Sequence, residues 1–252
     1  MEHTLHPNFW GNFQLAPAAL LIVGLLLVGF RKFALVATTL ERTSFNLGLL
    51  SILVVVNTPI GGFATTYFWC HMVQHMTLMM FSGPLLVIGT VNHWKFSGQI
   101  WETVTHPWFI WFAYAGVMIG VHFTSLHKLL MMNSVAHDFV EIPIYLLVAY
   151  LFYYHILDSK NSERKITPGV AVLSLFFMMV PETLTGFFIY AAPHSLYENM
   201  YTLEDQRLGG ALMWSGSMII DSIWLSIAVR EWLKSEEKRS REIDGEIARE
   251  KR

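Results

Sequence analysis

Two histidines one helical turn apart are the residues of this chain best suited to chemistry. His71 and His75 lie in an apolar stretch, residues 69–84, that also holds four methionines. At helical spacing the two imidazoles lie about 40° apart around the axis, and Met79 and Ser82 continue their stripe. Imidazole binds copper or zinc, and thioether sulfur favours copper(I). The stretch therefore predicts a membrane helix that handles a metal.

Further candidate ligands lie in other apolar stretches. Glu141 follows His137 by one helical turn, so the two side chains share a helix face. His122 ends a second stretch, and Glu182 lies within a third. Ionisable groups at membrane depth are costly and therefore functional candidates. We expect these groups to converge with the histidine pair in one cavity, where imidazole and carboxylate suit copper(II) or zinc.

Three residues are weaker candidates for the same site. Met79 is better explained by packing, because methionine fills irregular cores well. His127 lies in a connecting segment, and Asp205 opens the last apolar run, where the helix dipole favours a carboxylate. The small residues 209–211 that follow Asp205 predict a surface on which another helix packs closely.

The composition indicates the elements that position these residues. The chain has 252 residues, of which 54% are hydrophobic and 14% charged, which is too apolar for an ordinary soluble domain. We expect an all-α, polytopic membrane protein with seven spans. The predicted spans are residues 15–30, 45–60, 67–91, 107–122, 138–157, 168–191 and 208–230. Residues 1–230 would form one transmembrane domain, and residues 231–252 a charged tail.

Lysine and arginine predict how the spans are oriented. The connections after the first, third and fifth spans and the C-terminal end hold nearly all of these residues, whereas the other connections hold only Lys128 and Arg207. Basic residues gather on the cytoplasmic side of membrane proteins. The N-terminus is therefore predicted outside and the C-terminal tail in the cytoplasm. This orientation puts the histidine pair in the outer half of its span.

Three stretches of the chain together resemble a known family. They are residues 71–76 with the Leu-Met-Met and Gly-Pro-Leu-Leu-Val that follow, then Pro181 with Thr185-Gly186 and Leu196-Tyr197, and finally Asp205-Gln206 with Leu208-Gly209-Gly210 and Met213-Trp214. These motifs are similar to those of the CtaG-type cytochrome c oxidase assembly factors of bacteria, which are seven-span membrane proteins. The resemblance extends over about residues 57–224.

The resemblance implies a role in maturing a haem-copper terminal oxidase, through copper supply on the outer side of the bacterial plasma membrane. Oxidase subunits and the lipid bilayer are then the expected partners. His122 and His137 match positions where the family has histidines. From His137 the family often reads His-x-x-Glu-His, whereas Glu141 here stands in the place of the second histidine. A mixed histidine and carboxylate site is therefore expected.

Two other functions fit the residues. Histidines on different helices could bind haem in a membrane redox protein. Glu182 and Asp221, which we expect at different depths, could serve as relay groups of a proton- or metal-coupled transporter. No nucleotide-binding glycine loop, nucleophile elbow or zinc-protease motif is present, so we expect neither an enzyme nor a nucleic-acid partner. The last span has no lysine, which disfavours a retinal pigment.

Overall fold

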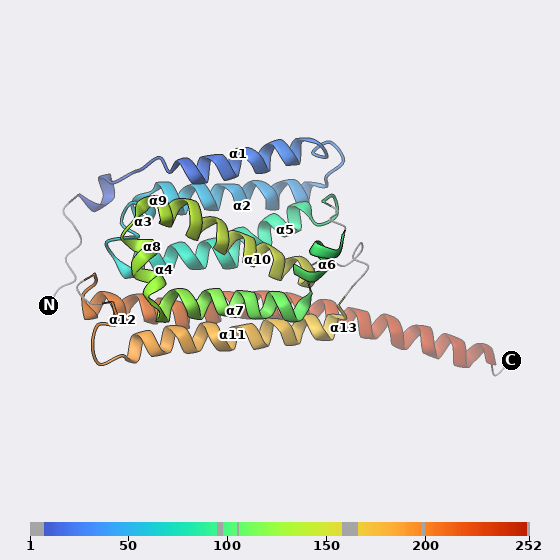
Figure 1. Ribbon diagram of the computed structural model, residues 1–252. Helices are drawn as coiled ribbons and strands as arrows, with labels where there is room; N and C mark the ends of the chain where they lie inside the picture. Colours follow the sequence, from blue (N-terminus) through green and yellow to red (C-terminus); the bar gives the residue numbers. More distant parts are fainter. Residues whose placement is uncertain (1–7, 95–97, 105, 158–165, 198–199, 251–252) are drawn as a thin grey trace.

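Long helices run side by side in the computed structural model, which describes residues 8–94, 98–104, 106–157, 166–197 and 200–250 (Figure 1). All regular structure within these ranges is helical, which confirms the all-α class. In chain order the elements are η1 (Phe9–Gly11), α1 (Pro17–Arg31), α2 (Thr39–Asn57), α3 (Pro59–Gly62), α4 (Phe68–Met76), η2 (Thr77–Ser82), α5 (Gly83–Thr90), α6 (Gln99–Val104), α7 (Pro107–Phe123), α8 (Ser125–Met131), α9 (Ser134–Ala136), η3 (His137–Glu141), α10 (Ile142–Leu157), α11 (Pro168–Ala191), α12 (Leu203–Ala211), η4 (Leu212–Gly216) and α13 (Ser217–Glu250).

Five continuous helical stretches are long and apolar enough to cross a bilayer. They are Thr39–Asn57, Phe68–Thr90, Ser134–Leu157, Pro168–Ala191 and Leu203–Glu250. A sixth results if α7 and α8, which meet at a bend of 79°, count as one span. α1 has 15 residues, about 22 Å of helix against a hydrocarbon core of about 30 Å. The protein is thus a multi-pass membrane protein by its apolar helices, and the count of seven stays a prediction.

Three of the long stretches contain a π-helical turn. η2 joins α4 to α5, η3 joins α9 to α10, and η4 joins α12 to α13. A π-helical turn changes the angular spacing of the residues within and after it, and such turns are frequent at functional sites. Side-chain directions beyond these turns therefore differ from those of an uninterrupted α-helix.

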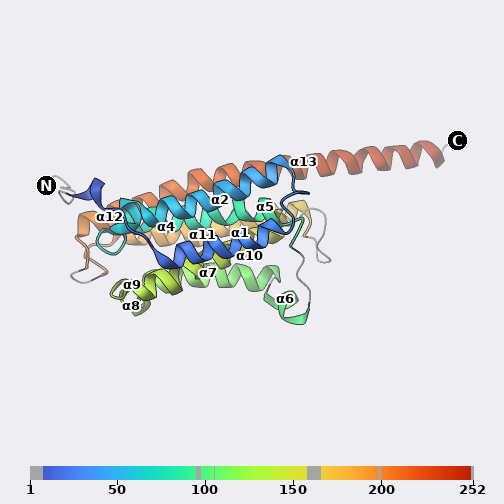
Figure 2. The same cartoon turned by 90° about the horizontal axis from the view of Figure 1, so that it is seen from above.

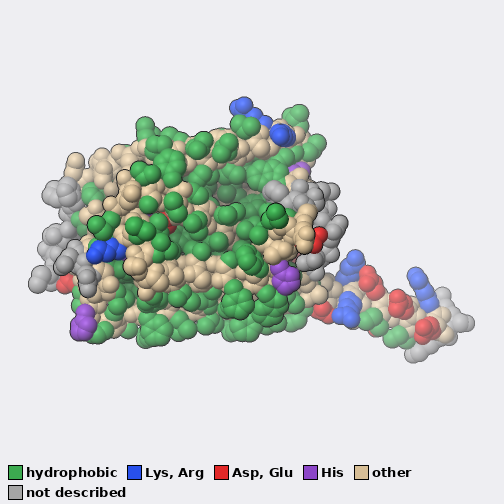
Figure 3. Space-filling model, in the orientation of Figure 1, with side chains coloured by type: hydrophobic (Ala, Val, Ile, Leu, Met, Phe, Trp, Pro, Cys, Tyr) green, Lys and Arg blue, Asp and Glu red, His purple; other side chains and the backbone are tan. Residues whose placement is uncertain are grey.

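The two ends of the bundle differ in shape and charge. One end holds α3, α8, α9 and the start of α12, while α13 projects from the opposite end (Figures 1 and 2). Hydrophobic side chains dominate the visible face of the bundle, whereas lysine, arginine and acidic residues gather on the projecting helix (Figure 3). Residues 231–250 of this helix are exposed throughout. We call the end with α8 the histidine end, for the side chains described below.

Small residues let α12 approach two neighbouring helices. A Cβ on Gly209 would lie 2.3 Å from Phe68 Cδ1 of α4, and a Cβ on Gly210 would lie 2.6 Å from the Tyr190 nitrogen of α11. Both distances are far below van der Waals contact, so only glycine fits. The packing surface predicted for residues 209–211 is confirmed at these two positions, and it holds α12 against the helix that carries His71.

Candidate metal centre

Five buried histidines come together at the histidine end of the bundle. The His71 and His75 rings of α4 have centroids 4.0 Å apart. The His122 ring, from the end of α7, lies 5.2 Å from that of His75. The His127 ring of α8 and the His137 ring of η3 lie 5.1 and 6.1 Å from that of His71. None of the five residues is more than 4% exposed.

Glu141 contributes the carboxylate of this cluster. Its Oε1 lies 3.3 Å from His75 Nε2 and 3.6 Å from His71 Nε2. Its Oε2 lies 3.8 Å from His137 Nε2. The Tyr145 hydroxyl donates a hydrogen bond of 3.0 Å to Oε1 and so fixes the carboxylate in place. The single acidic group is therefore shared by three imidazoles.

Two groups of side chains have the spacing of metal ligands. One group is His71, His75 and His122, and the other is His71, His137 and Glu141. Within each group the potential ligand atoms lie within 4.8 Å of one another, and every member is buried. Neutral imidazoles with one carboxylate match the preferences of copper(II) and zinc.

Hydrogen bonds fix the tautomer of two of these rings. His122 Nδ1 lies 2.6 Å from the Met118 carbonyl oxygen, which can only accept, so Nδ1 carries the proton. His137 Nδ1 lies 2.8 Å from Asp138 Oδ1, and this nitrogen donates to the carboxylate in the same way. The Nε2 lone pair of His122 is then free to bind a metal, an arrangement common around metal-ligating histidines, whereas His137 Nε2 lies 2.9 Å from Gln74 Oε1.

Many polar atoms of the cluster lack a hydrogen bond. A buried polar atom without a partner costs about 1–3 kcal/mol, so a group of them needs an explanation, and a bound ion is one. Among the described residues, the buried atoms without a hydrogen-bond partner include both ring nitrogens of His71, His75 and His127, together with His122 Nε2 and Glu141 Oε2. A neutral imidazole carries a lone pair on one ring nitrogen, so each of these rings, like the Glu141 carboxylate, offers an atom that a metal ion could bind.

The start of α4 is held by a residue far away in the chain. Asp205 of α12 accepts hydrogen bonds from the Phe68 and Trp69 backbone nitrogens, at 2.7 and 3.2 Å. A carboxylate at this position caps the helix and matches its dipole. Asp205 belongs to neither group of candidate ligands. Its position supports a structural role, which is to orient the helix that presents the histidine pair.

A sharp bend brings His127 into the cluster. α7 ends at Phe123, and Thr124 then takes an extended conformation and caps α8, its Oγ1 accepting a 3.1 Å hydrogen bond from the Leu126 nitrogen. The bend of 79° places α8 across the end of the bundle. Sequence alone ranked His127 among the weaker candidates. The Thr-Ser pair directly after α7 is the helix-start signal that could have indicated the bend.

Glu182 lies beside the cluster and belongs to neither group. Its Oε1 accepts a 2.6 Å hydrogen bond from the Tyr114 hydroxyl, and its carboxyl lies within hydrogen-bonding reach of the Asp221 carboxyl. The expectation that Glu182 and Asp221 lie at different depths is therefore wrong, because neighbouring α11 and α13 bring them into contact. Glu182 and Met79 line a small cavity together with His75.

The sequence did not single out four residues that support the cluster. Asp138 and Tyr145 hold His137 and Glu141 as described above, and Tyr114 holds Glu182. Gln74 Oε1 lies 2.9 Å from His137 Nε2. Only Gln74 carried a visible signal, since it stands between His71 and His75 in a buried stretch where an amide requires a partner.

Comparison with known proteins decides the family. The profile of the cytochrome c oxidase caa3 assembly factors (Caa3_CtaG) matches residues 23–235. The chain belongs to this family. The matched region contains every residue of the histidine and carboxylate cluster. The resemblance stated from the sequence motifs is thereby confirmed.

Two curated relatives of this chain are uncharacterised mycobacterial proteins. The chain is 23% identical over 224 residues to one from Mycobacterium leprae (strain TN), and 22% identical to one from Mycobacterium bovis. Each alignment covers 76% of this chain and 34% of the relative, so the chain spans about a third of their length. No solved structure matches the chain.

Proposed function

We propose that this protein is an assembly factor that binds a copper ion at the histidine end and passes it to a haem-copper oxidase. His71, His75 and His122 are the proposed ligands, with His137 and Glu141 at the second position beside them. The observation that carries the proposal is the pair of buried ligand groups, in which His71, His75, His122 Nε2 and Glu141 Oε2 have no hydrogen-bond partner within the described ranges. Family membership supports the oxidase as the recipient.

The position of the cluster supports exchange with the outer side of the membrane. It lies at the end opposite the charged extension of α13 (Figure 1). In the predicted orientation that end faces the outside of the bacterial plasma membrane. A pocket of about 310 Å³ opens there and is lined in part by His122, Lys128 and Tyr197. His122 thus belongs both to the cluster and to a pocket through which an ion could enter.

The chain's own residues account for capture without a chemical reaction. The Met118 carbonyl and the Asp138 carboxylate each hold one ring nitrogen, so His122 and His137 present their Nε2 atoms without rotating. Glu141 supplies negative charge that offsets part of the charge of the cation. Copper is the cargo in this scheme, and no bond in any substrate is made or broken.

The geometry does not favour the haem alternative. The ring centroids of His71 lie 4.0 Å from those of His75 and 6.4 Å from those of His122. The His71 and His75 rings are too close together to stand on opposite faces of a haem, whereas a single ion can bind beside both.

Metal analysis of the purified protein tests copper binding. We expect wild-type protein from copper-replete cells to retain copper, and His71→Ala and His122→Ala to retain less of it. His194→Ala is the matched control, because His194 is an exposed histidine outside both groups. Copper content undiminished in the two cluster variants would overturn the proposed site.

Oxidase assembly tests the role of that copper. In a strain lacking this protein we expect reduced cytochrome c oxidase activity, restored by the wild type and by His194→Ala but not by His71→Ala. The variants need equal abundance in the membrane, measured by immunoblot. Full restoration of oxidase activity by His71→Ala would separate the assembly role from the metal site.

A further inference from the structure

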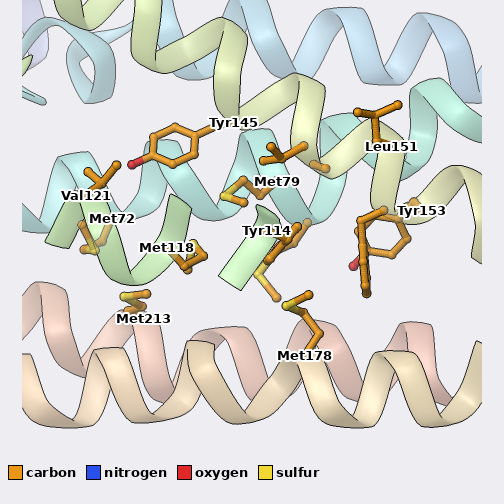
Figure 4. Packing of buried hydrophobic residues seen from close by; sticks show 14 of the residues in the cluster. Met72, Met79, Tyr114, Met118, Val121, Tyr145, Leu151, Tyr153, Met178 and Met213 are labelled. Carbon is orange, nitrogen blue, oxygen red and sulfur yellow. The ribbon is translucent and has the colours of Figure 1, made fainter. Parts of the chain in front are cut away.

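Six methionines line one small cavity next to the histidine cluster. They are Met72, Met76, Met79, Met80, Met118 and Met213. The chain has 13 methionines in all, so nearly half of them face a space of about 10 Å³, enough for about one water-sized particle. Figure 4 shows the side chains of Met72, Met118 and Met213 extending toward one another from three helical elements.

Core packing alone does not account for this concentration. The neighbouring core formed around α1 and α2 consists of alanine, valine, leucine, isoleucine and phenylalanine, with no methionine among its described members. The side chains of Phe45, Leu49 and Ile52 in that core are at most 5% exposed. The same bilayer-embedded bundle therefore packs well without thioethers. Within the described residues, methionines gather around the cavity and are absent from the neighbouring core.

Two residues that line the cavity carry buried polar atoms without a partner, which is a second indication of a ligand nearby. Ser217 and His75 both line the cavity and are at most 4% exposed. Among the described residues, Ser217 Oγ and His75 Nδ1 have no hydrogen-bond partner. Glu182 adds a carboxyl to the wall. Each unpaired polar atom is costly to bury, so a ligand bound beside these residues is one explanation for them.

We propose that this cavity is a second metal site, which binds Cu⁺ through the thioethers of Met72, Met118 and Met213. Soft thioether sulfur selects Cu⁺ over the hard divalent cations. The ion enters and leaves as Cu⁺, so no redox partner is needed. The Glu182 carboxyl provides the charge that a monovalent cation requires in a buried place. The inference rests on the proposed function in taking copper as the cargo.

His75 connects the two sites. It belongs to the group with His71 and His122, and it also lines the methionine cavity. The His75 imidazole can therefore contact a Cu⁺ ion in either site, so the ion can pass from nitrogen ligands to sulfur ligands without a change of oxidation state. Met72 precedes His75 on the same helix, and the Met118 carbonyl accepts the hydrogen bond that orients the His122 ring. The methionine site is thus contiguous with the histidine site.

A triple substitution to leucine tests the methionine site. Leucine preserves volume and apolarity but removes the sulfur, so Met72→Leu/Met118→Leu/Met213→Leu should fold. The full chain is titrated with Cu⁺ without oxygen, in competition with the chelator bicinchoninate, and X-ray absorption reports sulfur scattering around copper. We expect the wild type to show this scattering and the triple variant to lose it, together with one bound Cu⁺.

Met178→Leu is the matched control. Met178 is equally buried in the same core and is not part of the cavity wall. It should keep both the Cu⁺ and the sulfur scattering. If the triple variant unfolds at a lower temperature than the control, Met72→Leu and Met213→Leu singly must each weaken Cu⁺ binding. Unchanged Cu⁺ binding and scattering in the folded variants would overturn the methionine site.

One further variant separates this inference from the proposed function. His122 belongs to the histidine group and does not line the methionine cavity. We therefore expect His122→Ala to lose copper bound through nitrogen while the sulfur scattering of the Cu⁺-loaded protein persists. Unchanged nitrogen-bound copper in His122→Ala would overturn the histidine site. Unchanged Cu⁺ binding and sulfur scattering in the methionine triple variant would overturn the methionine site.

Discussion

The His137 ring has a polar partner at each nitrogen, and Gln74 Oε1 lies 2.9 Å from its Nε2. Its Nδ1 lies 2.8 Å from Asp138 Oδ1, while its Nε2 faces the carboxylate of Glu141. Asp138 is itself partly exposed and belongs to neither group of candidate ligands. Carboxylates in this position fix the orientation of a metal-ligating imidazole and raise its basicity.

Removing Asp138 should therefore weaken metal binding without abolishing it. For Asp138→Ala we expect a copper affinity about 10–100-fold lower than that of the wild type, measured by titration against a competing chelator. Ser134→Ala, an exposed substitution on the same segment, should change nothing. An Asp138→Ala protein with wild-type affinity would show that the carboxylate plays no part in orienting the ring.

At the scale of helices, the presentation of His71 and His75 depends on contacts between α4 and α12. Asp205 caps the first turn of α4, and Gly209 allows the two helices to touch. Both contacts lie at the histidine end of the bundle. They position the pair from outside the cluster, so their loss should affect the fold before it affects the number of ions bound.

Asp205→Ala tests this division of roles. Loss of a helix cap costs about 0.5–2 kcal/mol, so we expect a lower unfolding temperature in detergent, followed by circular dichroism. The folded variant should still bind as much copper as the wild type. Glu204→Ala, which changes the exposed neighbour of Asp205, should leave the unfolding temperature unchanged. Loss of copper from a stably folded Asp205→Ala protein would instead argue for direct ligation.

The long helices could be predicted because apolar runs between polar segments are visible in the sequence, but the directions of some side chains could not. Uninterrupted α-helical spacing put Ser82 on the stripe of His71 and His75. The π-helical turn η2 instead turns it toward α2, where its Oγ lies 2.7 Å from Ser51 Oγ. Met79, predicted on the same stripe, does line the cavity with His75. A π-helical turn such as η2 inserts a single residue into a helix, and the amino-acid composition of the segment does not indicate it.

The candidate site could be predicted in part for the same physical reason. Residue types and spacing pointed to His71, His75, His122, His137 and Glu141, which the fold brings together. The entry of His127 depends on a bend, and the contact between the Glu182 and Asp221 carboxyls depends on the register of two helices. Both are set by packing between distant segments, which local patterns do not encode.

At the scale of the whole molecule, charge distinguishes the two ends of the bundle. Lys128 lies at the histidine end, while Arg31, Lys32 and Arg42 lie at the end from which α13 projects. The exposed extension, residues 231–250, adds about 30 Å of charged helix at that end. This distribution is the one expected if α13 enters the cytoplasm.

Cysteine labelling checks this orientation. Cys70 is the lone cysteine and is fully buried, so the wild type supplies an unlabelled background. Ser125→Cys and Ser240→Cys place thiols at exposed positions of the two ends. A membrane-impermeant maleimide should label Ser125→Cys in intact cells, and Ser240→Cys only after permeabilisation. The reverse pattern would invert the predicted topology and place the cluster on the cytoplasmic side.

The cap on α4 also sets an order for biogenesis. Phe68 and its partner Asp205 are 137 residues apart in the chain. A ribosome adding about 5–20 residues each second delivers α12 roughly 7–27 s after the start of α4. During that interval α4 is in place with its first turn uncapped and its glycine contacts unmade. The histidine end therefore acquires its final form only when the last long helix arrives, so a half-inserted chain would present an incomplete site for copper.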